Sequence, residues 1–233
     1  MKKSKRISQR ASALTAGISL LIMAIVAGLT YGYLHGSLVV ADNAPATVSN
    51  LQSSTGLFRA ELLGWTIIFL LDALVAWALY HFFATTHKGL SFLSSFLRVL
   101  YTAILGVAIF NLPQILTLLN EQLSEVGMAE RPTDILNCIN SFENIWSHGL
   151  IIFGLHLVVL GYLSLLADHI HNAWGILLMI AGVSYTLLHT LYAIVPEVSG
   201  SLTLLESILA IPMTIGELGF ALWLIIKGGK TKA

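Results

Sequence analysis

The sequence predicts an all-α fold, a six-helix transmembrane bundle with both termini in the cytoplasm, and three observations support it. Of the 233 residues, 56% are apolar and only 10% are charged, and the mean hydropathy is +0.83. Long apolar runs follow one another along the chain, and the basic residues cluster between alternate runs. Because a soluble domain carries about 25% charged residues, this composition excludes a soluble single-domain enzyme, a disordered chain and a nucleic-acid binder with a basic surface.

Each apolar run has the length of a membrane-spanning helix. About 20 residues, at about 1.5 Å per residue, cross roughly 30 Å of hydrocarbon, whereas barrel strands alternate over about 10 residues. We therefore expect a single integral-membrane domain over residues 1–233, with an acidic outer loop at 120–144. The predicted spans are approximately 12–34, 57–83, 91–119, 145–166, 173–194 and 201–227.

The charged residues predict the orientation of these spans. Acidic residues dominate the 120–144 loop, which holds Arg131 as its one basic residue. Since positive charge stays in the cytoplasm, we expect this loop to face outward in a multi-pass protein of the plasma membrane. The basic residues on the opposite side are Lys2, Lys3, Lys5, Arg6, Arg10, Lys88, Lys227, Lys230 and Lys232.

The first apolar run has an alternative interpretation as a cleaved signal peptide ending at Val39-Val40-Ala41. A usual signal peptide has an apolar region of about 7 to 15 residues, and this run is longer. We therefore favour a retained first helix. Cleavage would leave five spans and an outer N-terminus beginning at Asp42.

Small residues recur every four positions in the first span, at Ala24, Gly28, Gly32 and Gly36. Such a stripe permits two helices to approach closely. The expected partner is another helix of the same chain, and the alternative is a homodimer or a second membrane subunit that binds through Gly28 and Gly32.

Three other residues carry structural predictions. Pro113 and Pro212 lie inside predicted spans, where each removes a helical hydrogen bond and should produce a kink. Cys138 is the single cysteine, so it forms no disulfide within the chain and is no sign of a metal site. The sequence contains no motif for a metal or a cofactor, and we predict neither.

Ionisable residues inside the spans are the main candidates for function, since each costs at least about 2.5 kcal/mol in hydrocarbon. Glu61 and Asp72, like Glu206 and Glu217, are 11 residues apart, which places each pair on one helix face about 16 Å apart in depth. Two layers result. The deeper layer is a network of Asp72, Arg98, His156 and Glu217, and the outer cluster contains Glu61, His148, His189 and Glu206.

The deeper network has more carboxyl groups than guanidinium groups. Two carboxylates against Arg98 would leave excess charge in a dry site, so we expect a protonated carboxyl, a charged His156 or a bound cation. The alternative is a structural network that holds the helices in register. Near the outer layer, Tyr185, His189 and Tyr192 should share one helix face.

Several motifs resemble a bacterial family of polytopic membrane proteins described as domain of unknown function 4386. They are Gly56-Leu57-Phe58-Arg59, Asp72 with Leu79-Tyr80, Leu97-Arg98, Phe153-Gly154-Leu155-His156, Leu160-Gly161-Tyr162-Leu163 and the segment from Gly216 to Gly228. The resemblance implies six helices and suggests that Asp72, Arg98, His156 and Glu217 are shared family features. It implies no reaction, ligand or cofactor.

The leading functional hypothesis is small-molecule or ion and proton-coupled transport, or ligand sensing, through the Asp72, Arg98, His156 and Glu217 network. One alternative is an accessory subunit of a membrane complex. Another is a membrane-embedded enzyme that acts on a lipid-like substrate with the outer His and Glu groups. Catalytic residues cannot be named from the sequence, and an enzyme is the less favoured of these classes.

Overall fold

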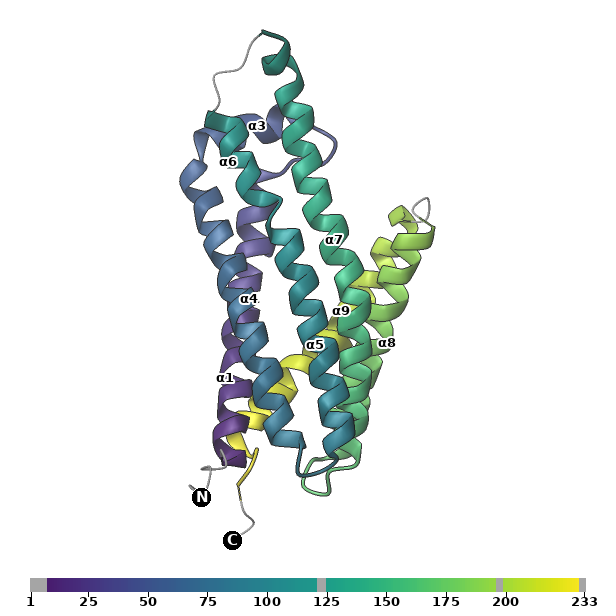
Figure 1. Ribbon diagram of the computed structural model, residues 1–233. Coiled ribbons are helices and arrows are strands. Elements are labelled where there is room, and N and C mark those ends of the chain that lie inside the picture. Colours follow the sequence, from purple (N-terminus) through teal and green to yellow (C-terminus); the bar gives the residue numbers. More distant parts are fainter. Residues whose placement is uncertain (1–7, 121–124, 196–198, 231–233) are drawn as a thin grey trace. The chain divides into compact units, whose positions relative to one another are not determined.

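The structure is a computed structural model that describes residues 8–120, 125–195 and 199–230 (Figure 1). In this part of the chain, six helices are long and apolar enough to cross a membrane. They are Gln9–Leu38, Thr55–Phe83, Lys88–Asn120, Glu130–Leu165, Asn172–Ile194 and Ser207–Ile226. The prediction of an all-α multi-pass membrane protein is confirmed.

The first span changes its helical type along its length. It begins as α1 (Gln9–Ala27), continues as the π-helical segment η1 (Gly28–His35) and ends as α2 (Gly36–Leu38). A short helix, α3 (Ala44–Ser53), follows, and the Asn43 side chain caps it by accepting a hydrogen bond from the Ala46 N–H at 3.0 Å. Because π-helical turns are rare and often mark functional sites, η1 is the least ordinary part of this span.

The third span is broken, where the sequence predicted only a kink. The second span is the single helix α4 (Thr55–Phe83), but the third consists of α5 (Lys88–Ile109) and α6 (Leu112–Asn120) with a turn at residues 110–111. Pro113 is the second residue of α6, where its missing N–H costs no helical hydrogen bond.

The prediction of an acidic outer loop at 120–144 is wrong from residue 125 onward. Helix α7 (Glu125–Leu165) begins within the predicted loop and continues without a break through the fourth span. Ile135, Ile139 and Phe142 are at most 2% exposed. These three residues recur at helical spacing and bury an apolar face, which explains why the segment is an extension of the span. Residues 121–124 lie outside the described part of the chain.

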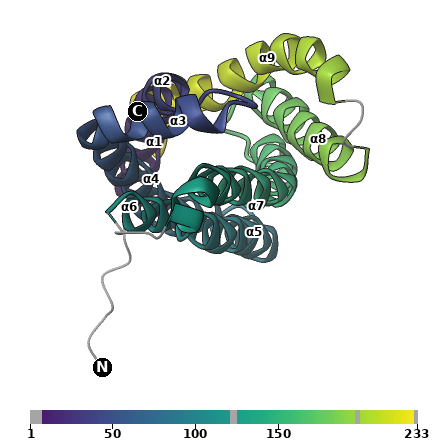
Figure 2. The same cartoon turned by 90° about the horizontal axis from the view of Figure 1, so that it is seen from above.

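The last two spans are α8 (Asn172–Ile194) and α9 (Ser199–Ile226), which lie side by side in both views (Figures 1 and 2). Pro212 lies inside α9, which continues through it. The predicted boundaries for these spans are within two residues of the observed helices at every end that could be compared.

Residue contacts divide the chain into two compact units. Unit 1 contains Met1–Ile22, Leu71–Thr102 and His148–Ala233, and unit 2 contains Met23–Leu70 and Ala103–Ser147. Helices α1, α4, α5 and α7 each contribute residues to both units. The single domain expected from the sequence stays a prediction, and each unit is described by itself below.

In unit 1, glycines allow α7 and α8 to pack closely. A Cβ atom added to Gly154 would lie 2.5 Å from the Gly182 carbonyl oxygen, and one added to Gly161 would lie 2.6 Å from the Gly175 carbonyl oxygen. Both pairs are separated by seven residues on their helices, so they form one seam. Any larger residue in this seam would force the two backbones apart.

The stripe predicted from the first span does not pack in this way. A Cβ added to Gly28, Gly32 or Gly36 would have no described atom within 4 Å. The prediction that these glycines contact another helix of the same chain is therefore wrong for the described residues. A partner from outside the chain stays a prediction.

Arg10 was predicted to set topology, and it also makes specific contacts within unit 1. Its guanidinium donates hydrogen bonds to three carbonyl oxygens at the end of α9, those of Leu224, Ile225 and Gly228, at 3.1, 2.5 and 2.8 Å. The last carbonyls of a helix have no helical partner and carry partial negative charge. Arg10 therefore caps α9.

Candidate functional site

Three residues of the predicted deeper network meet in unit 1. Helix α4 carries Asp72 and α5 carries Arg98, and the two form an ion pair. The hydroxyl of Thr102, one turn beyond Arg98, donates to Asp72 Oδ2 at 2.8 Å. The carboxylate thus receives both a charged and a neutral donor.

His156 of α7 completes this group as a neutral imidazole. Its Nδ1 lies 2.9 Å from the Ser94 carbonyl oxygen, which can only accept a hydrogen bond, so the proton is on Nδ1. Its Nε2 then accepts from Arg98 Nη1, which is 3.2 Å away. Asp72 and Arg98 balance each other in charge, and His156 adds none.

This group is dry. Asp72 and His156 are 0% exposed and Arg98 is 2% exposed, so there is no room for a water molecule against the first two. The Phe153 ring lies under the guanidinium, with its centroid 5.4 Å from Arg98 Cζ. A buried ion pair that packs on an aromatic ring resembles the structural networks that fix the positions of helices in protein cores.

Glu217, the fourth predicted member, lies at the edge of this group. It is half-buried on α9, and its carboxyl accepts a hydrogen bond from the Tyr185 hydroxyl of α8. It interacts with Arg98 and Asp72 electrostatically. The surplus carboxyl group expected from the sequence is therefore Glu217.

The predicted outer cluster of Glu61, His148, His189 and Glu206 stays a prediction. Glu61 belongs to unit 2, His148 and His189 belong to unit 1, and the side chain of Glu206 lies outside the described residues. His189 lies between the rings of Tyr185 and Tyr192, at 6.2 and 5.8 Å, so these three share a face as predicted. The described residues contain no group of three or more His, Cys, Asp or Glu arranged to hold a metal ion.

The partner of Glu61 is a histidine that the sequence analysis did not single out. His35, the last residue of η1, has Nδ1 at 2.7 Å from Glu61 Oε1 and Nε2 at 3.1 Å from Glu143 Oε1. The Glu61 side chain is 1% exposed and that of Glu143 is 38% exposed. One imidazole thus bridges a deeply buried carboxyl group and an accessible one.

This bridge cannot be satisfied by two carboxylates and a neutral imidazole. Carboxylate oxygens only accept hydrogen bonds, and a neutral imidazole donates only one. Either His35 is an imidazolium ion or one carboxyl group keeps a proton. The cluster therefore holds one more proton than two carboxylates and a neutral imidazole would. In addition, Glu61 Oε2 is buried and has no hydrogen-bond partner among the described residues.

Aromatic rings surround the His35 bridge. Tyr31 stacks on the His35 ring at 5.1 Å, and Trp65 packs edge-on against Phe142 and Trp146 at 4.9 and 5.0 Å. Trp65 is 1% exposed. Such a shell excludes water from Glu61 and strengthens its interaction with His35.

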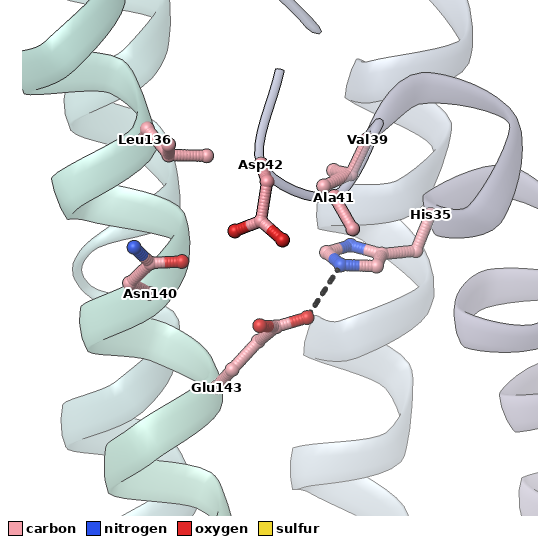
Figure 3. Close-up of a pocket in the computed structure, with 7 residues that line it drawn as sticks. All are labelled: His35, Val39, Ala41, Asp42, Leu136, Asn140 and Glu143. Atoms are coloured by element: carbon pink, nitrogen blue, oxygen red, sulfur yellow. Dashed lines mark hydrogen bonds and ion pairs between the residues drawn. The ribbon is translucent and has the colours of Figure 1, made fainter. Parts of the chain in front are cut away.

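A cavity of about 370 Å³ opens beside the bridge in unit 2. Asp42, Asn140 and Glu143 turn their polar ends toward one space, with the His35 ring beside them (Figure 3). The apolar part of the wall comes from Val39, Ala41 and Leu136.

The backbone before α3 holds one wall of this cavity in place. The Thr47 side chain accepts from the Val40 N–H at 3.0 Å and lies 3.2 Å from the Val40 carbonyl oxygen. Asp42 has φ of +56°, a left-handed conformation that non-glycine residues rarely adopt. Strained residues of this kind gather at functional sites, and here the strain aims a carboxylate into the cavity.

Aromatic residues close to His35, Glu61 and Glu143 in the sequence are the feature that could have indicated this site. Tyr31 lies four residues before His35, Trp65 lies four residues after Glu61, and Phe142 and Trp146 flank Glu143. Each acidic or imidazole group therefore has a large ring one helical turn away. Glu143 was assigned to a loop, and His35 lies one residue beyond the predicted end of the first span, so the pattern was missed.

Comparisons with known proteins give one relative and one family, both without a described activity. The chain is 29% identical over 170 residues to an uncharacterized protein of Archaeoglobus fulgidus, covering 73% of this chain and 85% of the relative. A similar chain therefore occurs in an archaeon. No solved structure matches the chain. Residues 15–228 match the family described as Domain of unknown function (DUF4386), and the chain belongs to that family.

Proposed function

We propose that this membrane protein binds a small organic cation, an ammonium compound with a short aliphatic body, in the cavity beside His35. The observation that carries this proposal is the convergence of the Asp42 and Glu143 carboxyl groups and the Asn140 amide on one space. Pockets of roughly 300 to 1,000 Å³ with a few convergent polar groups are typical ligand sites, and this cavity is at the small end of that range.

The charge of the site favours a cation. Three carboxyl groups, those of Asp42, Glu61 and Glu143, are grouped around one imidazole. Even with His35 charged, the site has more negative than positive groups. An ammonium group would donate hydrogen bonds to two carboxylates and to the Asn140 side-chain oxygen. Its carbon chain would contact Val39, Ala41 and Leu136.

The binding step includes a proton. His35 shares Glu143 with the cavity, so a cation at Glu143 competes with the His35 imidazolium for the same carboxylate. A ligand that binds there repels the charged ring and favours loss of its proton. This supports coupling of the ligand to a proton, as in proton-coupled transport or pH-dependent ligand sensing.

For the Asp72, Arg98 and His156 network we infer a structural role. The pairing of Asp72 with Arg98 and the lack of exposed surface at both residues support this role. A route for ions through this network would require the Asp72–Arg98 ion pair to separate. Separation would leave a buried charge without its partner, which is unfavourable.

The test is a thermal-shift and calorimetric titration of the purified protein in lipid nanodiscs. The probes are propylammonium, the neutral propanol and the anionic propionate, which have similar size. Propylammonium should raise the melting temperature and release or take up heat in a saturable way, whereas propanol and propionate should not. Equal effects of the three probes would contradict the proposal.

The matched variants separate the cavity from general surface charge. Glu143→Gln and Asp42→Asn should each weaken binding of propylammonium. Asp134→Asn is the control, since Asp134 is an exposed carboxylate on the same helix that does not line the cavity. A loss of binding in Asp134→Asn equal to that in Glu143→Gln would also contradict it.

A further inference from the structure

A second cavity lies where α8 begins and α9 ends, within unit 1. Its volume is about 500 Å³. It is independent of the His35 cavity and shares no residue with it. The lining residues are His171, Ala173, Trp174, Gly219, Leu222, Trp223, Ile226 and Lys227.

The wall of this cavity is apolar and aromatic. Leu222 is 47% exposed and Ile226 is 57% exposed, although both lie in the last span. The Trp174 ring packs directly over Gly219, where an added Cβ would lie 2.6 Å from Cη2 of the ring. A groove with exposed aliphatic residues beside tryptophans is suited to a hydrocarbon chain at the membrane interface.

The polar groups of this cavity are donors. His171 accepts the Ala173 N–H at its Nδ1, at 3.2 Å, so its proton is on Nε2 and can be donated. Lys227 is exposed at the end of α9. No carboxyl group is among the lining residues, and Asp168, in the turn before His171, does not line the cavity. The rim therefore complements a negative charge.

We propose that this cavity binds one anionic phospholipid, with its phosphate between Lys227 and His171 and an acyl chain along Leu222 and Ile226. The N-terminus of α8 adds partial positive charge on the same side. The ends of both spans place the rim at the level of lipid headgroups, where basic residues select anionic lipids.

The experiment measures quenching of tryptophan fluorescence by lipids with brominated acyl chains. The protein is reconstituted in vesicles that contain either brominated phosphatidylglycerol or brominated phosphatidylcholine, at equal bromine content. We expect half-maximal quenching of the site at about fivefold lower content of phosphatidylglycerol, the effect of about one lysine near a charged membrane surface. Lys227→Gln should remove this preference, and His171→Ala should reduce it.

Two controls make the result specific. Lys230→Gln changes an exposed lysine outside the cavity and should keep the preference for phosphatidylglycerol. Replacing both Trp174 and Trp223 by phenylalanine should remove most of the quenching that depends on the headgroup, because these two tryptophans line the cavity. Addition of excess inorganic phosphate should not displace the lipid.

Three outcomes would overturn the proposal. Equal quenching by the two lipids would show that the cavity does not select charge. An equal loss of preference in Lys230→Gln and Lys227→Gln would show a diffuse surface effect. Displacement by inorganic phosphate would assign the site to a free anion.

Discussion

The two buried histidines of this protein have opposite surroundings. In unit 1, His156 is neutral and closed, and the ion pair beside it is balanced. In unit 2, His35 bridges two carboxyl groups, and one of them reaches a cavity. We infer from this difference that an ionisable residue inside a membrane span is not by itself a functional signal. Access to a cavity distinguishes the second group.

The largest expected effect is the loss of a partner in the closed network. Arg98→Met leaves the buried Asp72 carboxylate without its ion pair, which should lower the free energy of unfolding by about 3 to 5 kcal/mol. Thermal unfolding in detergent, followed by circular dichroism, measures this. The double variant Asp72→Asn with Arg98→Met removes both charges and should recover most of the loss. A cost below about 1 kcal/mol for the single variant would contradict a structural role.

The next effect concerns the helix seam that supports His156. Gly182→Ala places a methyl group against the Gly154 carbonyl oxygen, so the α7 and α8 backbones must separate, at a cost of about 1 to 3 kcal/mol. Gly32→Ala is the matched control, because no described atom lies within 4 Å of its added Cβ. Thermal unfolding of both variants provides the comparison. Equal destabilisation would contradict the close packing of α7 and α8 at these glycines.

The open cluster should behave in the opposite way. Glu143→Gln keeps the size of the side chain but removes a charge from the cavity, so propylammonium should bind at least about tenfold more weakly, since a charge-assisted hydrogen bond contributes about 1.5 to 3 kcal/mol. The melting temperature should change little. Calorimetric titration in nanodiscs measures the affinity. A large loss of stability without a loss of affinity would show that Glu143 has a structural role and no binding role.

The two groups should also differ in their response to pH. A bound cation and a proton compete for the carboxylate of Glu143, which His35 also contacts. The affinity for propylammonium should therefore fall as the pH is lowered. His35→Gln should flatten this dependence. An affinity that rises on acidification would exclude competition between the ligand and the proton.

The smallest effect is expected at Asp42. Asp42→Gly relieves the left-handed backbone and should stabilise the protein by less than about 1 kcal/mol, while it weakens the binding of propylammonium. Asp42→Ala keeps the strain and should be less stable than Asp42→Gly. Melting temperatures and titrations of the two variants distinguish strain from charge, and identical stabilities would show that the φ value has no cost.

Much of the fold was predictable because the hydrocarbon of a membrane imposes length and composition on each span separately. The six spans and the meeting of Asp72, Arg98 and His156 follow from hydropathy, depth and helical spacing in the sequence. The end of the third span and the acidic segment were not predictable in the same way, since a turn at residues 110–111 and the extension of α7 depend on how apolar faces pack.

By itself, the sequence determined that the chain is a multi-pass helical membrane protein and which ionisable residues lie at a similar depth. Only the tertiary structure decided which of them are partners. His35, Glu61 and Glu143 come from three different spans, and their contacts depend on helix rotation and on the π-helical turns of η1. Hydropathy is insensitive to rotation about a helix axis, and that rotation determines whether a buried charge is closed in a network or faces a cavity.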